Sequence, residues 1–343
     1  MTRASALQRL RRIGGVATES RALRSAALAE IGRVVSFDAY VWALTDPETS
    51  VGTAPVAFVP PALMPDLPRL IRLKYLTPVN RWTSLSRAAR LDVPAASLVW
   101  RELLQGHGVT DVASVVFRDR YGCWAFLDLW RLGGTFARDE LAFLDEVVSL
   151  LTGHLRRCVA LCFAATAGGG PRDPGPVMLL LDAGLRVLGQ TPQTLEYLAR
   201  LLPPNSDTAP VPAVAYNVAA QLVAVEEGVD RRPPLARMHL ADARWLTLRA
   251  ARLGPDVGPD AQIAVTVEDS SLADRTAIFA RACGLAARET ELLHQLTTGA
   301  DTRTIATRMF LSDNTVQDHL KSIFDKTGTR SRRALLSRAA GTA

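Results

Sequence analysis

The chain reads SDNTVQDHLKSIFDKTG from residue 312 to residue 328. Apolar side chains recur in this stretch at i, i+4, i+7 and i+8: Val316, Leu320, Ile323 and Phe324. That spacing places them in one stripe along an α-helix. Ser312 can cap the start of the helix through its hydroxyl, and Gly328 stands where helices commonly end. The stretch therefore predicts a helix that packs by one face.

The other face of this helix is polar. At 100° per residue, Asn314, Asp318, Lys321 and Asp325 point away from the apolar stripe. Thr315 and Gln317 lie on its flanks. A helix that packs by one side and presents short polar and basic groups on the other can enter the major groove of DNA.

Three further helices surround it in the sequence. Residues 287–298 and 302–309 show helical apolar spacing, a short turn covers 310–312, and a fourth helix follows Ser331. Between residues 317 and 338 basic side chains outnumber acidic ones: Lys321, Lys326, Arg330, Arg332, Arg333 and Arg338 against Asp318 and Asp325. Phosphates attract such a surface. The pattern predicts a helix-turn-helix DNA-binding domain.

The matching motif runs from Leu285 to about Ala340. It comprises Leu285-x-x-Arg288-Glu289-x-Glu291-Leu292-Leu293, Gly299, Ile305-Ala306, Ser312-x-x-Thr315-Val316-x-x-His319, Ile323, Lys326-x-Gly328 and Arg332. This pattern resembles the LuxR-type helix-turn-helix family, and agreement at so many positions is highly specific. The resemblance implies a four-helix domain, a third helix that reads the major groove, and homodimers on inverted-repeat operators in double-stranded DNA.

The resemblance also implies roles for single residues. Arg303, Thr315 and His319 would touch phosphate or sugar, and Gln317, Asp318 and Lys321 would face base edges. Asn314 and Lys326 complete the predicted contact set. The family usually has Lys at the position of Gln317 and a small or apolar residue at that of Asp318. Gln317 can pair with adenine, and Asp318 can accept the N4 amino proton of cytosine.

The rest of the chain is long enough for further domains. A chain of 343 residues exceeds the size of most single cores, and 48% hydrophobic against 22% charged residues is ordinary for globular protein. Glycine and proline crowd residues 167–175, which predicts a linker. We expect domains at 1–166, 176–268 and 284–343. The net charge of +6 suits a polyanionic partner, although it is modest and spread along the chain.

Both preceding blocks alternate helices and strand-like runs. In the first, helical patterns at 20–34, 68–76, 95–105 and 136–163 enclose a strand at 37–44 and a hairpin at 111–130, while the proline-containing stretch 53–68 reads as loop. In the second, strand-like runs at 177–181, 185–189, 235–240, 244–252 and 262–267 flank helices at 192–202 and 211–227. The predicted fold class is α+β: two antiparallel-sheet sensor domains, then an all-α domain.

Two weaker resemblances accompany this pattern. Residues 20–165 resemble the GAF domains fused to LuxR-type regulators in actinobacteria, through the runs 37–42, 46–49 and 118–124. Residues 176–268 resemble a PAS domain only in the order of their elements. Trp42 and Trp82 are the predicted ligand-binding residues of the first block, because large rings line apolar pockets. The alternative for each ring is a place in the core.

These features predict a one-component, sequence-specific transcription regulator that responds to a small-molecule or protein signal through its N-terminal sensor domains. The alternative is a constitutive regulator whose first two blocks serve only for dimerisation. An enzyme is disfavoured, because no Walker loop, Ser-His-Asp arrangement or pair of acids in a suitable setting is found. No cofactor or metal is expected, since the four cysteines and isolated histidines show no ligand spacing. Without a signal peptide or a run of about 20 apolar residues, we expect no membrane contact and a cytoplasmic location.

Overall fold

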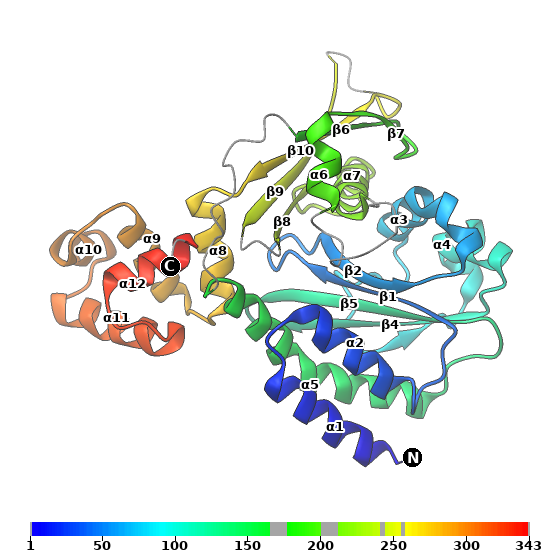
Figure 1. Cartoon of the computed structure of the whole chain (residues 1–343), viewed down its shortest axis with the longest axis horizontal. Coiled ribbons are helices and arrows are strands. Elements are labelled where there is room, and N and C mark those ends of the chain that lie inside the picture. Colours follow the sequence, from blue (N-terminus) through cyan, green and yellow to red (C-terminus); the bar gives the residue numbers. More distant parts are fainter. Residues whose placement is uncertain (1, 165–176, 200–211, 241–243, 255–257, 342–343) are drawn as a thin grey trace.

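The computed structural model describes residues 2–164, 177–199, 212–240, 244–254 and 258–341 (Figure 1). It confirms the predicted α+β class, with two antiparallel five-stranded sheets followed by a helical C-terminal domain. We call residues 2–164 the first module, the described residues of 177–269 the second module, and 285–341 the C-terminal domain. The predicted linker at 167–175 and the end of the predicted helix 192–202 lie outside the described residues.

The first module is built on a central sheet with strand order β2-β1-β5-β4-β3. Its strands are β1 (Ala39–Thr45), β2 (Gly52–Phe58), β3 (Ala89–Arg90), β4 (Asp111–Asp119) and β5 (Gly122–Arg131). Its helices are α1 (Arg3–Val16), α2 (Ser20–Ile31), α3 (Leu67–Leu76), α4 (Leu98–Glu102) and α5 (Arg138–Cys162), with short 3₁₀ turns at Pro61–Asp66, Pro94–Ala96 and Leu104–His107. Figure 1 shows α1, α2 and α5 on one side of this sheet and α3 and α4 on the other. Both sides are therefore covered.

Two predictions for the first module were wrong in detail. The stretch read as loop contains β2, because Pro55 lies on an edge strand of the sheet, where a missing N–H removes no interior ladder bond. The single helix expected at 95–105 is instead α4 flanked by two 3₁₀ turns. The hairpin and the long helix α5 were predicted within two residues of their ends.

The second module repeats the strand order of the first, as β7-β6-β10-β9-β8. Its strands are β6 (Val177–Leu181), β7 (Val187–Gln190), β8 (Leu235–His239), β9 (Trp245–Arg252) and β10 (Ile263–Asp269), and its helices are α6 (Pro192–Ala199) and α7 (Ala213–Glu226). Ten of the 14 residues of α7 are buried. Such a helix, apolar on all sides, belongs in a core. It packs against both the second sheet and the first module, so one hydrophobic cluster spans the two modules.

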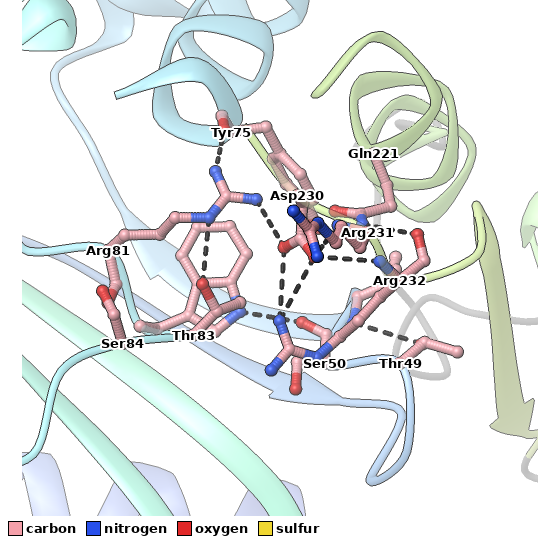
Figure 2. A network of polar contacts seen from close by, with 12 residues as sticks. Thr49, Ser50, Tyr75, Arg81, Thr83, Ser84, Gln221, Asp230, Arg231 and Arg232 are labelled. Atoms are coloured by element: carbon pink, nitrogen blue, oxygen red, sulfur yellow. Dashed lines mark hydrogen bonds and ion pairs between the residues drawn. The ribbon is translucent and has the colours of Figure 1, made fainter. Parts of the chain in front are cut away.

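Two buried ion pairs fasten the modules to each other. Arg237 on β8 donates to Asp46 at the end of β1, with Nε 2.7 Å from Oδ2, and the side chains are 4% and 0% exposed. In Figure 2, Arg81 of the first module donates to Asp230 of the second over 2.9 Å and to the backbone carbonyl of Tyr75. Breaking such a buried pair leaves an uncompensated charge, so both pairs hold the modules in one arrangement.

The C-terminal domain follows helix α8 (Leu272–Ala282). It consists of α9 (Ala287–Thr297), α10 (Thr302–Met309), α11 (Asp313–Thr327) and α12 (Arg332–Ala340), at the predicted positions. Its core continues into the rest of the molecule through Phe163 at the end of α5, Trp245 on β9 and Phe279 on α8. The ring of Phe163 lies 4.7 Å from that of Trp245 and 5.2 Å from that of Phe279. None of the described helices combines the length and the apolar character that crossing a membrane requires.

Candidate DNA-binding surface and internal cavity

Helix α11 has the capping and the two faces that its sequence predicts. The hydroxyl of Ser312 accepts a hydrogen bond from the backbone N–H of Thr315 over 3.2 Å, and Gly328 ends the helix at φ 64°. The buried side chains of α11 are Val316, Leu320, Ile323 and Thr327. They join the core of the C-terminal domain, so the opposite side of the helix faces solvent.

The eight residues predicted to contact DNA all reach solvent. Six are exposed: Arg303, Asn314, Gln317, Asp318, Lys321 and Lys326. Thr315 and His319 are half-buried, and the Thr315 hydroxyl lies 2.9 Å from that of Ser312 at the helix start. The structure thus presents seven of them along α11 and Arg303 on the preceding helix, α10.

Lys326 is engaged inside the domain. Its ammonium donates to both carboxylate oxygens of Glu289 on α9, over 2.7 and 2.6 Å. Glu289 also accepts from the Ser322 hydroxyl and from the backbone N–H of Ala286. Burial opposes ionisation of Glu289, but these three donors outweigh it and lower its pKa. We call this group the Glu289 clasp, and it ties α9 to α11.

Four basic side chains on or near α11 are exposed and unengaged among the described residues. Within the described part of the chain, Arg303, Lys321, Arg330 and Arg333 are exposed and make no hydrogen bond or ion pair. Arg332 and Arg338, by contrast, donate to Thr302 and to the backbone carbonyl of Thr327. Arg330 and Arg333 lie outside the predicted contact set, although the basic surplus in their segment points to them.

A second feature is a cavity of 1380 Å³ on the side of the first sheet that α3 covers. It lies against β1, β2, β5 and α3 and extends past β2 to the last turns of α5, to β8 and to α8. Most of its wall is apolar, including Val41, Phe58, Leu70, Ile71 and Trp130. Ligand sites in proteins are typically concave, mostly apolar and supplied with a few fixed polar groups.

This cavity has such a polar group. The ammonium of Lys74 lies 2.7 Å from Oδ2 of Asp128, and the Ser114 hydroxyl donates to Oδ1 of Asp128 over 2.6 Å. All three residues line the cavity. The carboxylate keeps free lone pairs and the ammonium keeps free donors, so the group can orient a ligand that carries polar atoms.

The two tryptophans predicted to bind a ligand lie elsewhere. Trp42 is fully buried on the other side of the sheet, where it stacks on Phe117 at 5.0 Å. Trp82 is 2% exposed, stacks on Phe126, and donates its Nε1–H to the carbonyl of Ser50. Neither belongs to the cavity wall, and both occupy the core positions that were the alternative. Lys74, Ser114 and Asp128 escaped prediction because they come from three separate elements.

The comparisons with known proteins agree with the C-terminal geometry. Residues 284–339 match the family described as bacterial regulatory proteins, luxR family. No curated relative matches the chain. Among solved structures, Escherichia coli SdiA is similar at 13% identity over 99% of this chain and 96% of that one, with a TM-score of 0.36. A Vibrio cholerae VqmA structure is similar at 17% identity over 49% of this chain and 83% of that one, with a TM-score of 0.21.

The family match and the exposed face of α11 define the class of the protein. It is a DNA-binding regulator whose C-terminal domain is of the luxR type. The superpositions on SdiA and VqmA are too loose to assign a ligand or a partner.

Proposed function

We propose that this protein is a one-component transcription regulator in which a small organic molecule in the cavity controls DNA binding. The first and second modules are then GAF-like and PAS-like sensor modules, and the C-terminal domain binds an inverted-repeat operator as a homodimer. The observation that carries the proposal is the cavity itself, with its apolar wall and its Lys74–Asp128–Ser114 group.

The position of the cavity supports a route to the DNA-binding domain. Its wall includes Trp245 and Ile278, and both residues also belong to the hydrophobic cluster that holds the C-terminal domain. The indole Nε1 of Trp245 is buried and has no hydrogen-bond partner in the described part of the chain. A ligand at this end would therefore contact the junction on which the placement of the DNA-binding helices depends, and differential contacts are what shift a conformational equilibrium.

Shared topology supports a common type for the two modules. Both sheets have the same strand order, although their sequences show no evident repeat. The dimer rests on the implied operator symmetry, since one luxR-type domain reads one half-site. Helices α1, α2 and α5, which form one outer layer of the first module, are the proposed contact between subunits.

The test has two arms on the purified full-length protein. A metabolite library is screened for ligands that raise the melting temperature, because a ligand that binds only the folded state stabilises it by mass action. Any ligand found is then added to a gel-shift assay on the promoter region of the protein's own gene. We expect a stabilising ligand and a ligand-dependent change in salt-sensitive DNA binding.

A matched pair of variants assigns the effect to the cavity. Val41→Trp fills the cavity from its wall, whereas Val93→Trp adds the same ring at an exposed site outside it. Only Val41→Trp should abolish stabilisation by the ligand. DNA binding without any response to the library would favour a constitutive regulator, and absence of salt-sensitive DNA binding would contradict the regulator altogether.

A further inference from the structure

One end of the cavity carries a buried arginine that forms no ion pair with a described residue. Arg24 on α2 is 1% exposed and lines the cavity. The nearest acidic neighbour in sequence, Glu19, is exposed, and it attracts Arg24 without forming an ion pair. A buried cation without a counter-ion is unfavourable, which is why buried charges in proteins are normally paired.

Backbone carbonyls satisfy only part of this guanidinium. Its Nε donates to Ser20 over 3.1 Å, and its Nη1 donates to the carbonyls of Trp42 and Ala54 over 2.7 and 2.8 Å. These two carbonyls flank the bulge at which the β1–β2 register shifts, and Ala54 has φ 33°. Nη2 forms no hydrogen bond in the described part of the chain. Two of the five guanidinium donors therefore remain for another acceptor.

The surroundings of Arg24 add positive potential. Arg21, one turn earlier on α2, also lines the cavity and makes no ion pair with a described residue. Burial and the repulsion from Arg21 lower the pKa of Arg24 to about 9. Ser20, at the N-terminal end of α2, lines the same part of the wall, where the helix dipole also favours negative charge. The exposed carboxylate of Glu19 opposes this, so Arg21 and the helix dipole must outweigh it.

We propose that Arg24, assisted by Arg21, is an anion subsite of the cavity, and that the ligand is an organic anion with an apolar body. The anionic group, a carboxylate or a phosphate, accepts from Nη2 of Arg24. The body lies along the apolar wall, which near this end includes Val56, Cys158 and Val159. This inference rests on the proposed function, because it assigns the charge of the ligand that the cavity takes.

The experiment compares four probes of equal chain length on the full-length protein. Dodecanoate, dodecyl phosphate, dodecanol and dodecylamine are titrated below their micelle concentrations by isothermal titration calorimetry. We expect one saturable site for at least one anion, at least tenfold tighter than for dodecanol, and no site for dodecylamine. The relative affinities for dodecanoate and dodecyl phosphate then show whether the subsite prefers a carboxylate or a phosphate.

Two variants of the subsite and one control outside the cavity locate the effect. Arg21→Gln should weaken binding of the anion several-fold and leave dodecanol unchanged, whereas Arg11→Gln, an exposed arginine on α1 outside the cavity, should change neither. Arg24→Lys keeps the charge but replaces the planar fork of five donors with an ammonium of three, so it should weaken anion binding further in protein that still melts cooperatively.

Three outcomes overturn the inference. Dodecanol bound as tightly as the anions would mean an apolar cavity without an anion subsite, and the proposed function would stand. Anion binding that Arg21→Gln and Arg24→Lys leave intact would place the anion elsewhere. No saturable binding by any probe would remove the anion subsite, while the library screen and the gel shift would still decide the proposed function independently.

Discussion

The two sheets have the same strand order but differ in what covers them. The first sheet has helices on both sides and borders a cavity of 1380 Å³ on the side that α3 covers. The inner side of the second sheet is filled by α7, ten of whose 14 residues are buried. Strand order alone therefore does not determine whether a cavity remains beside a sheet. The side chains of the covering helices decide whether the space over a sheet is filled. Here a cavity borders the first sheet, whereas α7 fills the core of the second module.

The largest expected effect tests whether the first and the second module unfold as one unit. Asp46→Ala removes the carboxylate that pairs with buried Arg237 and should lower the free energy of unfolding by about 4 kcal/mol. Urea unfolding measures this loss, and a second transition should separate as the modules uncouple. As control, Glu291→Ala breaks an exposed pair with Arg288 and should cost less than about 0.5 kcal/mol. Equal losses in the two variants would refute the role of the buried pair.

A leucine in the packed core of the second module and a leucine at the cavity should differ in what their removal costs. Leu179 on β6 is fully buried in the filled module, whereas Leu70 on α3 lines the cavity. Leu179→Ala should cost about 3 kcal/mol, because a new void opens in a packed core. Leu70→Ala should cost under about 2 kcal/mol, since its side chain already borders empty space. Chemical denaturation of both variants gives the two values, and identical losses would mean that the cavity is closed in solution.

The sequence predicted the filled regions better than the hollow one. The stripe of Val316, Leu320 and Ile323 is local, and its 3.6-residue period fixed both the helix and its buried face. The hairpin was equally clear, because both of its strands are contiguous and its turn is short. By contrast, β2 was missed, since Pro55 is compatible with a strand only at a sheet edge, and an edge is a property of the whole sheet.

The residues of the candidate sites also divide into those that one local element determines and those that only the assembled fold brings together. The exposed face of α11 is a property of one helix, so its residues could be chosen from the sequence. Lys74, Ser114 and Asp128 meet only when α3, β4 and β5 are assembled, and nothing local marks them. Large rings such as Trp42 suggested a pocket, but a ring on a strand can face either side of the sheet. Here the strand register places the Trp42 ring on the side of the sheet that faces the core.

A surface variant of the C-terminal domain should leave both sheets unaffected and change only DNA recognition. Asp318 is exposed on α11, and we propose that it accepts from cytosine. Asp318→Ala should alter the preferred base at one operator position by about 2 kcal/mol of discrimination, with an unchanged melting temperature. Binding selection on randomised operators measures this. A uniform change in affinity for all sequences would instead assign Asp318 to general repulsion of phosphate.

The Glu289 clasp makes the filled C-terminal domain sensitive to acid. The pKa of the Glu289 carboxyl group is lowered in the folded state. The ionised carboxylate therefore stabilises the domain at every pH above the ordinary pKa range of a carboxyl group. That stability is lost as the pH falls through the lowered value. Glu289→Gln should cost about 1.5 kcal/mol near pH 7, and the difference in stability from the parent protein should shrink as the pH falls below about 4. Melting temperatures across this range test the sign. A difference that widens on acidification would contradict the clasp.

The smallest predicted effect concerns a residue that packs against neither a core nor a cavity. Phe310, between α10 and α11, is 94% exposed and has φ 56°, a left-handed backbone that favours glycine. Phe310→Gly removes the strain but adds freedom to the unfolded chain, so it should stabilise the protein by only about 0.5 kcal/mol. Phe310→Ala keeps the strain and should give no gain. Thermal unfolding of both variants measures these changes. Because the exposed side chain has almost no packing to lose, Phe310→Gly should not lower the melting temperature markedly. A marked loss would show that the ring packs against a surface in solution.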